Sequence, residues 1–313
     1  MSLDPHLAGV LKSLAAAGRK PTHECTIEEA RGEYLALTYG SRTPQQVVPV
    51  GSVEDTEVPG GSGQLRARIY RPSDIGPSPT VVFFHGGGFV IGNLDSHDNM
   101  CRDICRSSNS VVVSVDYRLA PEHPFPAAVK DAIAATTWVI EHASKLGGSD
   151  VVAVAGDSAG GNLATVVAQH FSEQGVALAA QFLIYPALDT SDASHPSREE
   201  NANGFFLEKE TLAWFIAQYT GDLKDHKTPQ LTPINAHSLE GLPPALIISA
   251  EFDPLRDEAE VYGQKLLAAG VSTEVVRGAG MIHGFFDMGR WSPAAQDLIQ
   301  KSCTRFGEIM RGI

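Results

Sequence analysis

The stretch VVAVAGDSAGGNLA, residues 151–164, joins an apolar, valine-rich run to a run of small residues. Residues 156–160 have the form Gly-x-Ser-x-Gly. With a strand before it and a helix after it, this motif holds a nucleophilic serine on a sharp turn. Side chains at positions 156 and 160 would collide there, and the helix N-terminus favours negative charge developing at Ser158. A match of this form also arises by chance in a tight turn, but its context favours a catalytic Ser158.

The same alternation of strand and helix continues on both sides of this stretch. Apolar, mostly β-branched runs predict strands at residues 80–84, 111–115, 151–155, 181–185, 245–249 and 273–276. Helical segments are predicted near residues 96–108, 126–145, 159–173, 257–269 and 293–310. Before them, Leu65, Ala67 and Ile69 alternate with more polar residues, as on a half-buried strand. Near-continuous apolar strands separated by helices indicate an α/β fold with a mostly parallel sheet covered on both faces.

Two parts of the chain depart from this rhythm. Residues 1–40 predict two helices, the second of which opens with a capping box from Thr26 to Glu29. Residues 190–232 begin with a polar stretch and continue into a helical run around Trp214 and Tyr219. This second part is expected to be an insertion above the sheet.

Composition excludes several classes of function. The 313 residues carry a formal net charge of −13, which would repel a phosphate backbone, so no nucleic acid is expected as a partner. We find no signal peptide and no apolar stretch of membrane-spanning length, and we therefore expect a soluble, cytoplasmic protein with no membrane partner.

Four cysteines occur along the chain. Cys101 and Cys105 lie four residues apart in a predicted helix, which would suit a metal site or a redox pair, or two small side chains packed on one helical face. No second cysteine or histidine pair at zinc spacing accompanies them. We expect packing, with no metal and no disulfide.

A serine hydroxyl needs a base, and the base comes late in the chain in this architecture. His283 lies in a loop with glycines nearby, after the last predicted strand. His6, His142 and His170 fall in predicted helices, and His123 falls in a proline-rich turn. His283 is therefore the predicted base.

The third member of a triad is a carboxylate that orients the histidine, after a strand and before the histidine in the chain. Glu251, Asp253, Asp257 and Glu258 all follow the predicted strand 245–249. Asp253 precedes Pro254 and could be only a helix cap. Asp257 and Glu258 are expected to lie in the helix and to point away from the carboxyl edge of the sheet. Asp253 is the predicted acid.

Gly86, Gly87 and Gly88 follow the predicted strand 80–84. Attack by Ser158 on an ester carbonyl creates an oxyanion, and backbone N–H groups approach it closely only where no Cβ intervenes. The three glycines, with Ala159 after the nucleophile, are the predicted oxyanion hole, and the sequence leaves open which two glycines donate. His85 is expected to brace the loop. A phosphate-binding loop would need a Gly-Lys-Ser/Thr ending or Gly-x-Gly-x-x-Gly spacing, and neither occurs here.

The chain resembles the hormone-sensitive-lipase-like family of α/β-hydrolases, also called bacterial family IV esterases. The matching stretches are HGGGFVIG (85–92), DYRLAPEHPFPAAVKDA (116–132), GDSAGGNLA (156–164), EFDPLRDE (251–258) and HGF (283–285). The resemblance implies an eight-stranded sheet, the triad Ser158, Asp253 and His283, and the glycine oxyanion hole with Ala159. It also implies a cap made of residues 1–45 and an insertion, 190–232, on a catalytic domain of residues 46–189 and 233–313. The family usually has Ser-Pro where this chain has Thr232-Pro233.

These observations predict a carboxylic ester hydrolase that acts on small-molecule esters through an acyl-serine intermediate, without a cofactor. Hydrolysis of an amide, lactone or carbamate stays open, and so does a non-catalytic binding protein, although all three triad residues are present. The family's esterases favour short to medium acyl chains, and the expected pocket residues are Phe89, Phe205, Phe206, Leu207, Trp214 and Phe215. The physiological ester and the oligomeric state, a homodimer included, cannot be inferred from the sequence.

Overall fold

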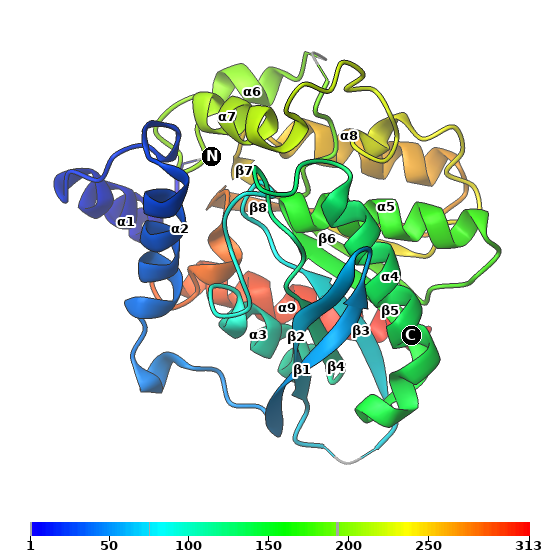
Figure 1. The fold of residues 1–313 in the computed structure, drawn as a ribbon. Helices are drawn as coiled ribbons and strands as arrows, with labels where there is room; N and C mark the ends of the chain where they lie inside the picture. The colour runs from blue at the N-terminus through cyan, green and yellow to red at the C-terminus, as the bar shows by residue number, and fades with distance from the viewer. Residues whose placement is uncertain (1, 75, 192–193) are drawn as a thin grey trace.

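A computed structural model describes residues 2–74, 76–191 and 194–313, and its centre is an eight-stranded sheet (Figure 1). The strands run in the order β1-β2-β4-β3-β5-β6-β7-β8, antiparallel at the β1/β2 and β2/β4 pairs and parallel from β4 to β8. Their bounds are β1 Ser52–Gly60, β2 Gly63–Arg71, β3 Ser78–Phe84, β4 Val111–Val115, β5 Gly148–Asp157, β6 Gln181–Ile184, β7 Ala245–Phe252 and β8 Thr273–Ile282. The predicted fold class is confirmed.

Burial along the strands follows from their place in the sheet. Strands β3, β4 and β6 are buried along their whole length, as expected for parallel strands covered on both faces. In β2, Leu65, Ala67 and Ile69 are buried and confirm the predicted alternation. Strand β1 was not recognised in the sequence, because most of this edge strand is exposed and lacks an apolar pattern.

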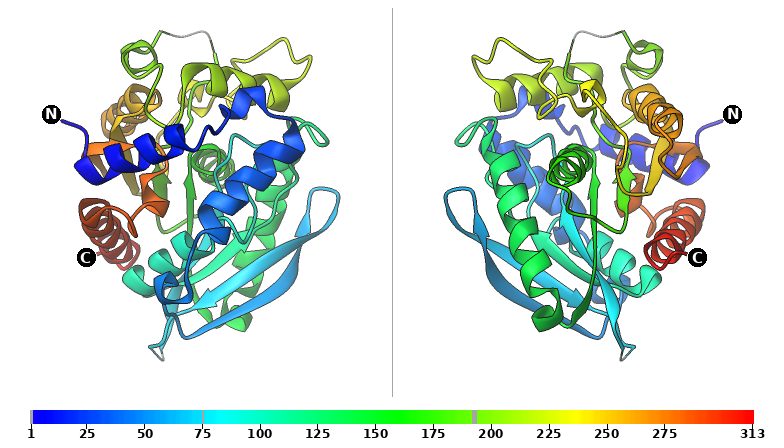
Figure 2. Two further views of the ribbon diagram at one scale, coloured as in Figure 1. Left: turned by 90° about the vertical axis from the view of Figure 1, so that its left-hand side faces the viewer. Right: turned by 90° about the vertical axis from the view of Figure 1, so that its right-hand side faces the viewer.

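Helices cover both faces of the sheet (Figures 1 and 2). Helices α4, α5 and α8 supply one core, with Leu163 and Leu266, and α3 and α9 supply the other, with Ile104 and Phe306. The helix bounds are α1 Pro5–Ala16, α2 Ile27–Leu35, α3 Asp98–Ser108, α4 Ala127–His142, α5 Ala159–Glu173, α6 Pro196–Glu200, α7 Lys209–Thr220, α8 Arg256–Ala268 and α9 Pro293–Met310. Within the described ranges, no helix combines the length and the apolar character that crossing a bilayer would require.

Helices α1, α2, α6 and α7 lie together above one end of the sheet (Figure 2). The capping box predicted at the start of α2 is present, because Thr26 and Glu29 bond each other's backbone N–H groups. The N-terminal segment contacts α7 through His23, whose Nδ1 lies 3.0 Å from Thr211 Oγ1. Of the predicted insertion, residues 192–193 lie outside the described residues. The division into a cap and a catalytic domain stays a prediction.

The four cysteine side chains are buried and carry free thiols. Cys101 and Cys105 lie on α3 and pack into the same core as Ile104. Burial raises the pKa of Cys105 to about 12, so its thiol stays protonated. These surroundings agree with the packing interpretation of the pair.

Candidate active site

A sharp turn joins β5 to α5 and carries Ser158. The Ser158 backbone has φ 53° and ψ −117°, and α5 begins at the next residue. A Cβ on Gly156 would lie 2.2 Å from the carbonyl oxygen of Gly160, and a Cβ on Gly160 would lie 1.9 Å from that of Phe84. Both positions therefore require glycine, as the Gly-x-Ser-x-Gly motif predicts on steric grounds.

Ser158, His283 and Asp253 form one line of hydrogen bonds. His283 Nε2 lies 3.0 Å from Ser158 Oγ, and His283 Nδ1 lies 2.7 Å from Asp253 Oδ2. A carboxylate only accepts hydrogen bonds, so Nδ1 carries the imidazole proton and Nε2 is left to accept from the serine hydroxyl. All three side chains are buried, which excludes most of the competing water. The structure brings together the three residues that the sequence assigned to a triad.

The Asp253 carboxylate also makes a cap-like contact. Its Oδ1 accepts a hydrogen bond of 2.9 Å from the Leu255 N–H, just before α8 begins at Arg256. The helix-cap alternative and the triad contact are thus both present, one on each carboxylate oxygen. The hydrogen bond from the Leu255 N–H to Oδ1 orients the carboxylate so that Oδ2 faces His283.

The glycine loop after β3 lies beside Ser158. Gly87 and Gly88 have φ values of 111° and 60°, which side chains rarely adopt. Both line the same cavity as Ser158 and Ala159, and none of the described residues accepts a hydrogen bond from the N–H of Gly87 or Gly88. Ala159, the first residue of α5, has one of the N–H groups that a helix leaves without an internal partner. Three backbone donors are therefore available next to the serine hydroxyl.

Gly86 does not share this role: the sequence left open which two of the three glycines donate, and the Gly86 N–H already has a partner. Its N–H donates a hydrogen bond of 2.7 Å to Asp157 Oδ1, and a Cβ at Gly86 would lie 2.4 Å from Asp157 Oδ2. Asp157, the residue before the nucleophile, thus accepts the hydrogen bond of the Gly86 N–H and holds the glycine loop against the Ser158 turn.

The His85 side chain packs against the glycine loop and stabilises it, as predicted. Its ring stacks on Tyr117 at 4.3 Å, and its Nδ1 lies 2.7 Å from the Gly86 carbonyl oxygen. The Tyr117 hydroxyl donates a 2.6 Å hydrogen bond to the His85 carbonyl. Burial lowers the pKa of His85 to about 3, so the ring is neutral and Nδ1–H can donate to that carbonyl.

A cavity of about 360 Å³ opens at Ser158 and His283. Its walls come from the loops after β3, β5, β6 and β8 and from the helices above them. Its lining includes residues of α1, α2 and α7 as well as of these loops, and much of it is apolar. The cavity has room for a small apolar group next to a nucleophile, a base and three N–H donors.

The sequence profile of the α/β-hydrolase fold matches residues 81–287. This chain is an α/β-hydrolase. Carboxylic ester hydrolase LipN of Mycobacterium tuberculosis is 47% identical over 244 residues, which are 75% of this chain and 65%, slightly under two thirds, of LipN. An ethyl acetate hydrolase of Pseudomonas putida is 36% identical over 92% of this chain and 93% of its own length. These names agree with the resemblance to hormone-sensitive-lipase-like esterases.

Solved structures extend this likeness over the whole hydrolase. The structure of a hyperthermophilic esterase from the archaeon Pyrobaculum calidifontis superposes with a TM-score of 0.92 at 39% identity. The match covers 100% of this chain and 99% of the other, so the helices above the sheet are included in it.

Four of the predicted pocket residues line the cavity of the hydrolase: Phe89, Phe206, Leu207 and Phe215. The other two, Phe205 and Trp214, are not among its lining residues. Phe205 stacks on Phe252 at 5.0 Å, and Trp214 meets the edge of Phe215 at 5.3 Å. Both side chains pack against another aromatic ring instead of lining the cavity.

Two of these aromatic rings lie against residues next to the reactive groups. A Cβ on Gly88 would lie 2.1 Å from Cγ of Phe215, so that ring packs on the oxyanion loop. A Cβ on Gly284, next to His283, would lie 3.2 Å from Cε1 of Phe206. Both rings therefore form part of the cavity wall near Ser158 and His283.

The sequence analysis missed several residues of the cavity wall. Tyr219 stacks on Phe89 at 3.8 Å, and its spacing of four from Phe215 on α7 was a signal that could have found it. Glu258 also lines the cavity, so the prediction that it points away from the site is wrong. The first turn of α8 faces the loop after β6, and this turns the Glu258 side chain inward.

Metal ligands are a separate question for this site. Among the residues that the structure describes, no three His, Cys, Asp or Glu side chains form a group suited to a metal ion. The candidate chemistry rests on Ser158, His283 and backbone donors.

Proposed function

We propose that this α/β-hydrolase is a carboxylic ester hydrolase that works through an acyl-Ser158 intermediate. The observation that carries the proposal is the line of hydrogen bonds from Ser158 through His283 to Asp253, at 3.0 and 2.7 Å. A serine hydroxyl becomes nucleophilic when a positioned base removes its proton, and an oriented imidazole is that base. The relatives named as ester hydrolases support the same reaction.

In the first half of the reaction, Ser158 Oγ attacks the ester carbonyl carbon while His283 Nε2 takes its proton. The imidazole becomes a cation, and the Asp253 carboxylate, 2.7 Å from Nδ1, stabilises it. The carbonyl oxygen becomes an oxyanion that accepts hydrogen bonds from the N–H groups of Gly87, Gly88 and Ala159. The N-terminal end of α5 adds a favourable dipole at the same place.

In the second half, the alcohol leaves and water completes the cycle. Protonated His283 gives its proton to the leaving oxygen as the carbon–oxygen bond of the ester breaks. Water then donates a proton to Nε2 and attacks the acyl carbon, and the returning proton restores the Ser158 hydroxyl. Each proton moves between Ser158, His283, water and the substrate, so the proposed cycle uses no cofactor and no metal.

The proposed substrates are esters with short to medium acyl chains. A cavity of about 360 Å³ has room for a small ligand, and the rings of Phe206 and Phe215 in its wall limit the space for a long acyl chain. A relative named as an ethyl acetate hydrolase supports a small acyl group.

Two further proposals come from the sequence. Residues 1–45 and 190–232 act together as a cap, supported by the contact of His23 with Thr211 at 3.0 Å. The protein is cytoplasmic, supported by four cysteines that keep buried free thiols.

Replacing Gly87 by alanine is expected to lower kcat about 10²- to 10³-fold, the usual cost of losing an oxyanion donor. Its Cβ would lie 2.1 Å from the Ile91 carbonyl oxygen, at a φ of 111° that disfavours side chains, so the loop has to move its N–H groups. The rate is measured with an aryl ester, and folding is checked by circular dichroism. Gly63→Ala is the matched control, since Gly63 has a φ of 109° but nothing within 4 Å. Equal kcat values for the two variants would contradict the donor role.

The acyl-chain preference is tested with a series of aryl esters. We expect kcat/KM to peak near about four to six acyl carbons, because apolar walls favour each added methylene until the pocket ends. Each methylene that fits contributes up to about 0.8 kcal/mol, or about fourfold. Phe206→Ala should move the peak to longer chains, whereas Phe205→Ala, whose ring stacks on Phe252 instead, should leave it in place. A rise that continues through palmitate would show a lipase.

A further inference from the structure

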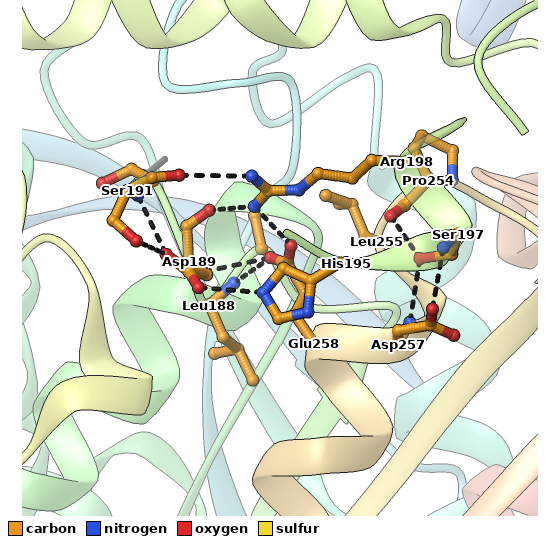
Figure 3. A network of polar contacts seen from close by, with 12 residues as sticks. Leu188, Asp189, Ser191, His195, Ser197, Arg198, Pro254, Leu255, Asp257 and Glu258 are labelled. Carbon is orange, nitrogen blue, oxygen red and sulfur yellow. Dashed lines mark hydrogen bonds and ion pairs between the residues drawn. The ribbon is translucent and has the colours of Figure 1, made fainter. Parts of the chain in front are cut away.

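A buried polar network joins three segments next to the site (Figure 3). It includes the loop after β6, from Leu188 to Ser191, the helix α6 with Arg198, and the first turn of α8 with Glu258. None of the steps of ester hydrolysis uses these side chains. The network nevertheless begins one turn after Asp253 and ends beside Ser158.

Glu258 is the centre of this network. Its Oε1 accepts hydrogen bonds from the N–H groups of Leu188 at 2.7 Å and Asp189 at 3.1 Å. Its Oε2 accepts a 2.7 Å bond from Arg198 Nη2. The residue is 0% exposed, and burial raises its pKa while the Arg198 charge and the Leu188 N–H oppose that effect. A buried carboxylate with three donors and a paired cation is held in one orientation.

The other side of the same loop is attached to the nucleophile turn. The Ala187 N–H donates a 3.0 Å bond to the Ser158 carbonyl oxygen. The Ala187 carbonyl accepts a 2.8 Å bond from Asn162 Nδ2, on the first turn of α5. The loop from Ala187 to Asp189 thus lies between Ser158 and Glu258 and contacts both.

Glu258 is in turn connected to the acid of the triad. The Arg256 N–H donates to the Asp253 carbonyl at 3.1 Å, and the Leu255 N–H donates to the Asp253 side chain at 2.9 Å. The first turn of α8 and Asp253 therefore form one hydrogen-bonded unit. A displacement of Glu258 relative to the β6 loop therefore also displaces Asp253 relative to Ser158.

We infer that Glu258 is a positioning residue that sets the distance between the turn carrying Ser158 and the turn carrying Asp253. The inference rests on the proposed function, because it assigns Ser158 and Asp253 their roles. Rates of this kind of reaction are sensitive to such placement, since a misplacement of about 1 Å can cost about 10²-fold.

Glutamine at position 258 is the decisive change. It keeps the shape of the side chain, but one oxygen becomes an NH₂ group that only donates. That group has to face either the two backbone N–H groups or the Arg198 guanidinium, which are donors as well. Arg198 keeps its hydrogen bonds to the carbonyl oxygens of Asp189 and Ser191, so its guanidinium is held in place and does not move away from the new NH₂ group.

The test measures kcat per active site, counted by titration with a serine-directed phosphonate. We expect Glu258→Gln to lower both kcat per titrated site and the rate of phosphonylation by about 10- to 10²-fold. A purely structural role would lower only the titratable fraction and the melting temperature. Asp257→Asn is the matched control and should keep wild-type kcat, because Asp257 binds the Ser197 N–H of α6 at 2.7 Å but not the β6 loop.

Arg198→Gln is made alongside, in case the buried substitution prevents folding. Its side chain is 14% exposed, and its loss leaves the Glu258 carboxylate in place without the cation, so kcat per site should fall in the same direction. Wild-type kcat per titrated site in either folded variant overturns the inference. Ser158→Ala distinguishes a failure of the proposed function from a failure of the inference about Glu258. If Ser158→Ala stays active, the proposed function fails. If Ser158→Ala is inactive and only the Glu258 result fails, the proposed function stands.

Discussion

Ser158→Ala is expected to lose at least about 10³-fold in kcat toward an aryl ester, while the protein stays folded. The hydroxyl is the group that forms the acyl intermediate, and its removal leaves only water as a nucleophile beside the oxyanion donors. Among the described residues, the Ser158 hydroxyl hydrogen-bonds only His283, at 3.0 Å, so the fold loses little with it. The rate and the circular dichroism spectrum are measured on the same preparation.

A covalent label gives the independent check. A serine-directed phosphonate should modify one residue of the wild-type protein, and mass spectrometry should locate it at Ser158. The matched control is Ser302→Ala, which removes a buried serine on α9, in the other helix layer, and should leave both kcat and labelling unchanged. Labelling at another residue, or esterase activity that persists in Ser158→Ala, would refute the assignment of the nucleophile.

Asp253→Asn is expected to lower kcat about 10³- to 10⁴-fold. An asparagine NH₂ facing Nδ1 of His283 favours the tautomer with its proton on Nε2, and that nitrogen can no longer accept from Ser158. The neutral amide also fails to stabilise the imidazole cation. The amide oxygen can keep the 2.9 Å bond from the Leu255 N–H, so the helix start is preserved. The measurement is kcat on protein whose melting temperature is known.

Asp257→Asn provides the comparison at a carboxylate four residues away. Asp257 binds the Ser197 N–H and Arg256, and neither contact reaches His283. Its replacement should change kcat little. Equally small effects at both positions would mean that Asp253 is only a helix cap, and a large effect at Asp257 alone would move the acid there.

Local rules account for what the sequence predicted well. The Gly156 and Gly160 positions follow from the sterics of one turn, and the order of Ser158, Asp253 and His283 follows from where loops leave a parallel sheet. These features depend on a few neighbouring residues or on chain order. A single sequence contains both kinds of information.

Features that depend on packing between distant segments could not be predicted. Gly86 loses its donor to Asp157, a residue 71 positions away, and nothing in the glycine run indicates this contact. Glu258 turns inward because the β6 loop presents N–H groups to it. Phe205 stacks on Phe252 of β7 instead of lining the cavity, and this contact joins segments far apart in the chain.

The order of the strands has a consequence for how activity is acquired. Ser158 follows β5, whereas Asp253 and His283 follow β7 and β8, and β6 separates the two groups. A ribosome therefore releases the nucleophile 125 residues before its base, and the nascent chain carries an unreactive serine until most of its length has emerged. Refolding from denaturant obeys the same constraint, since turnover cannot return before β8 has paired with β7. Ester hydrolysis is thus a reporter of the pairing of β7 and β8, which brings Asp253 and His283 to Ser158.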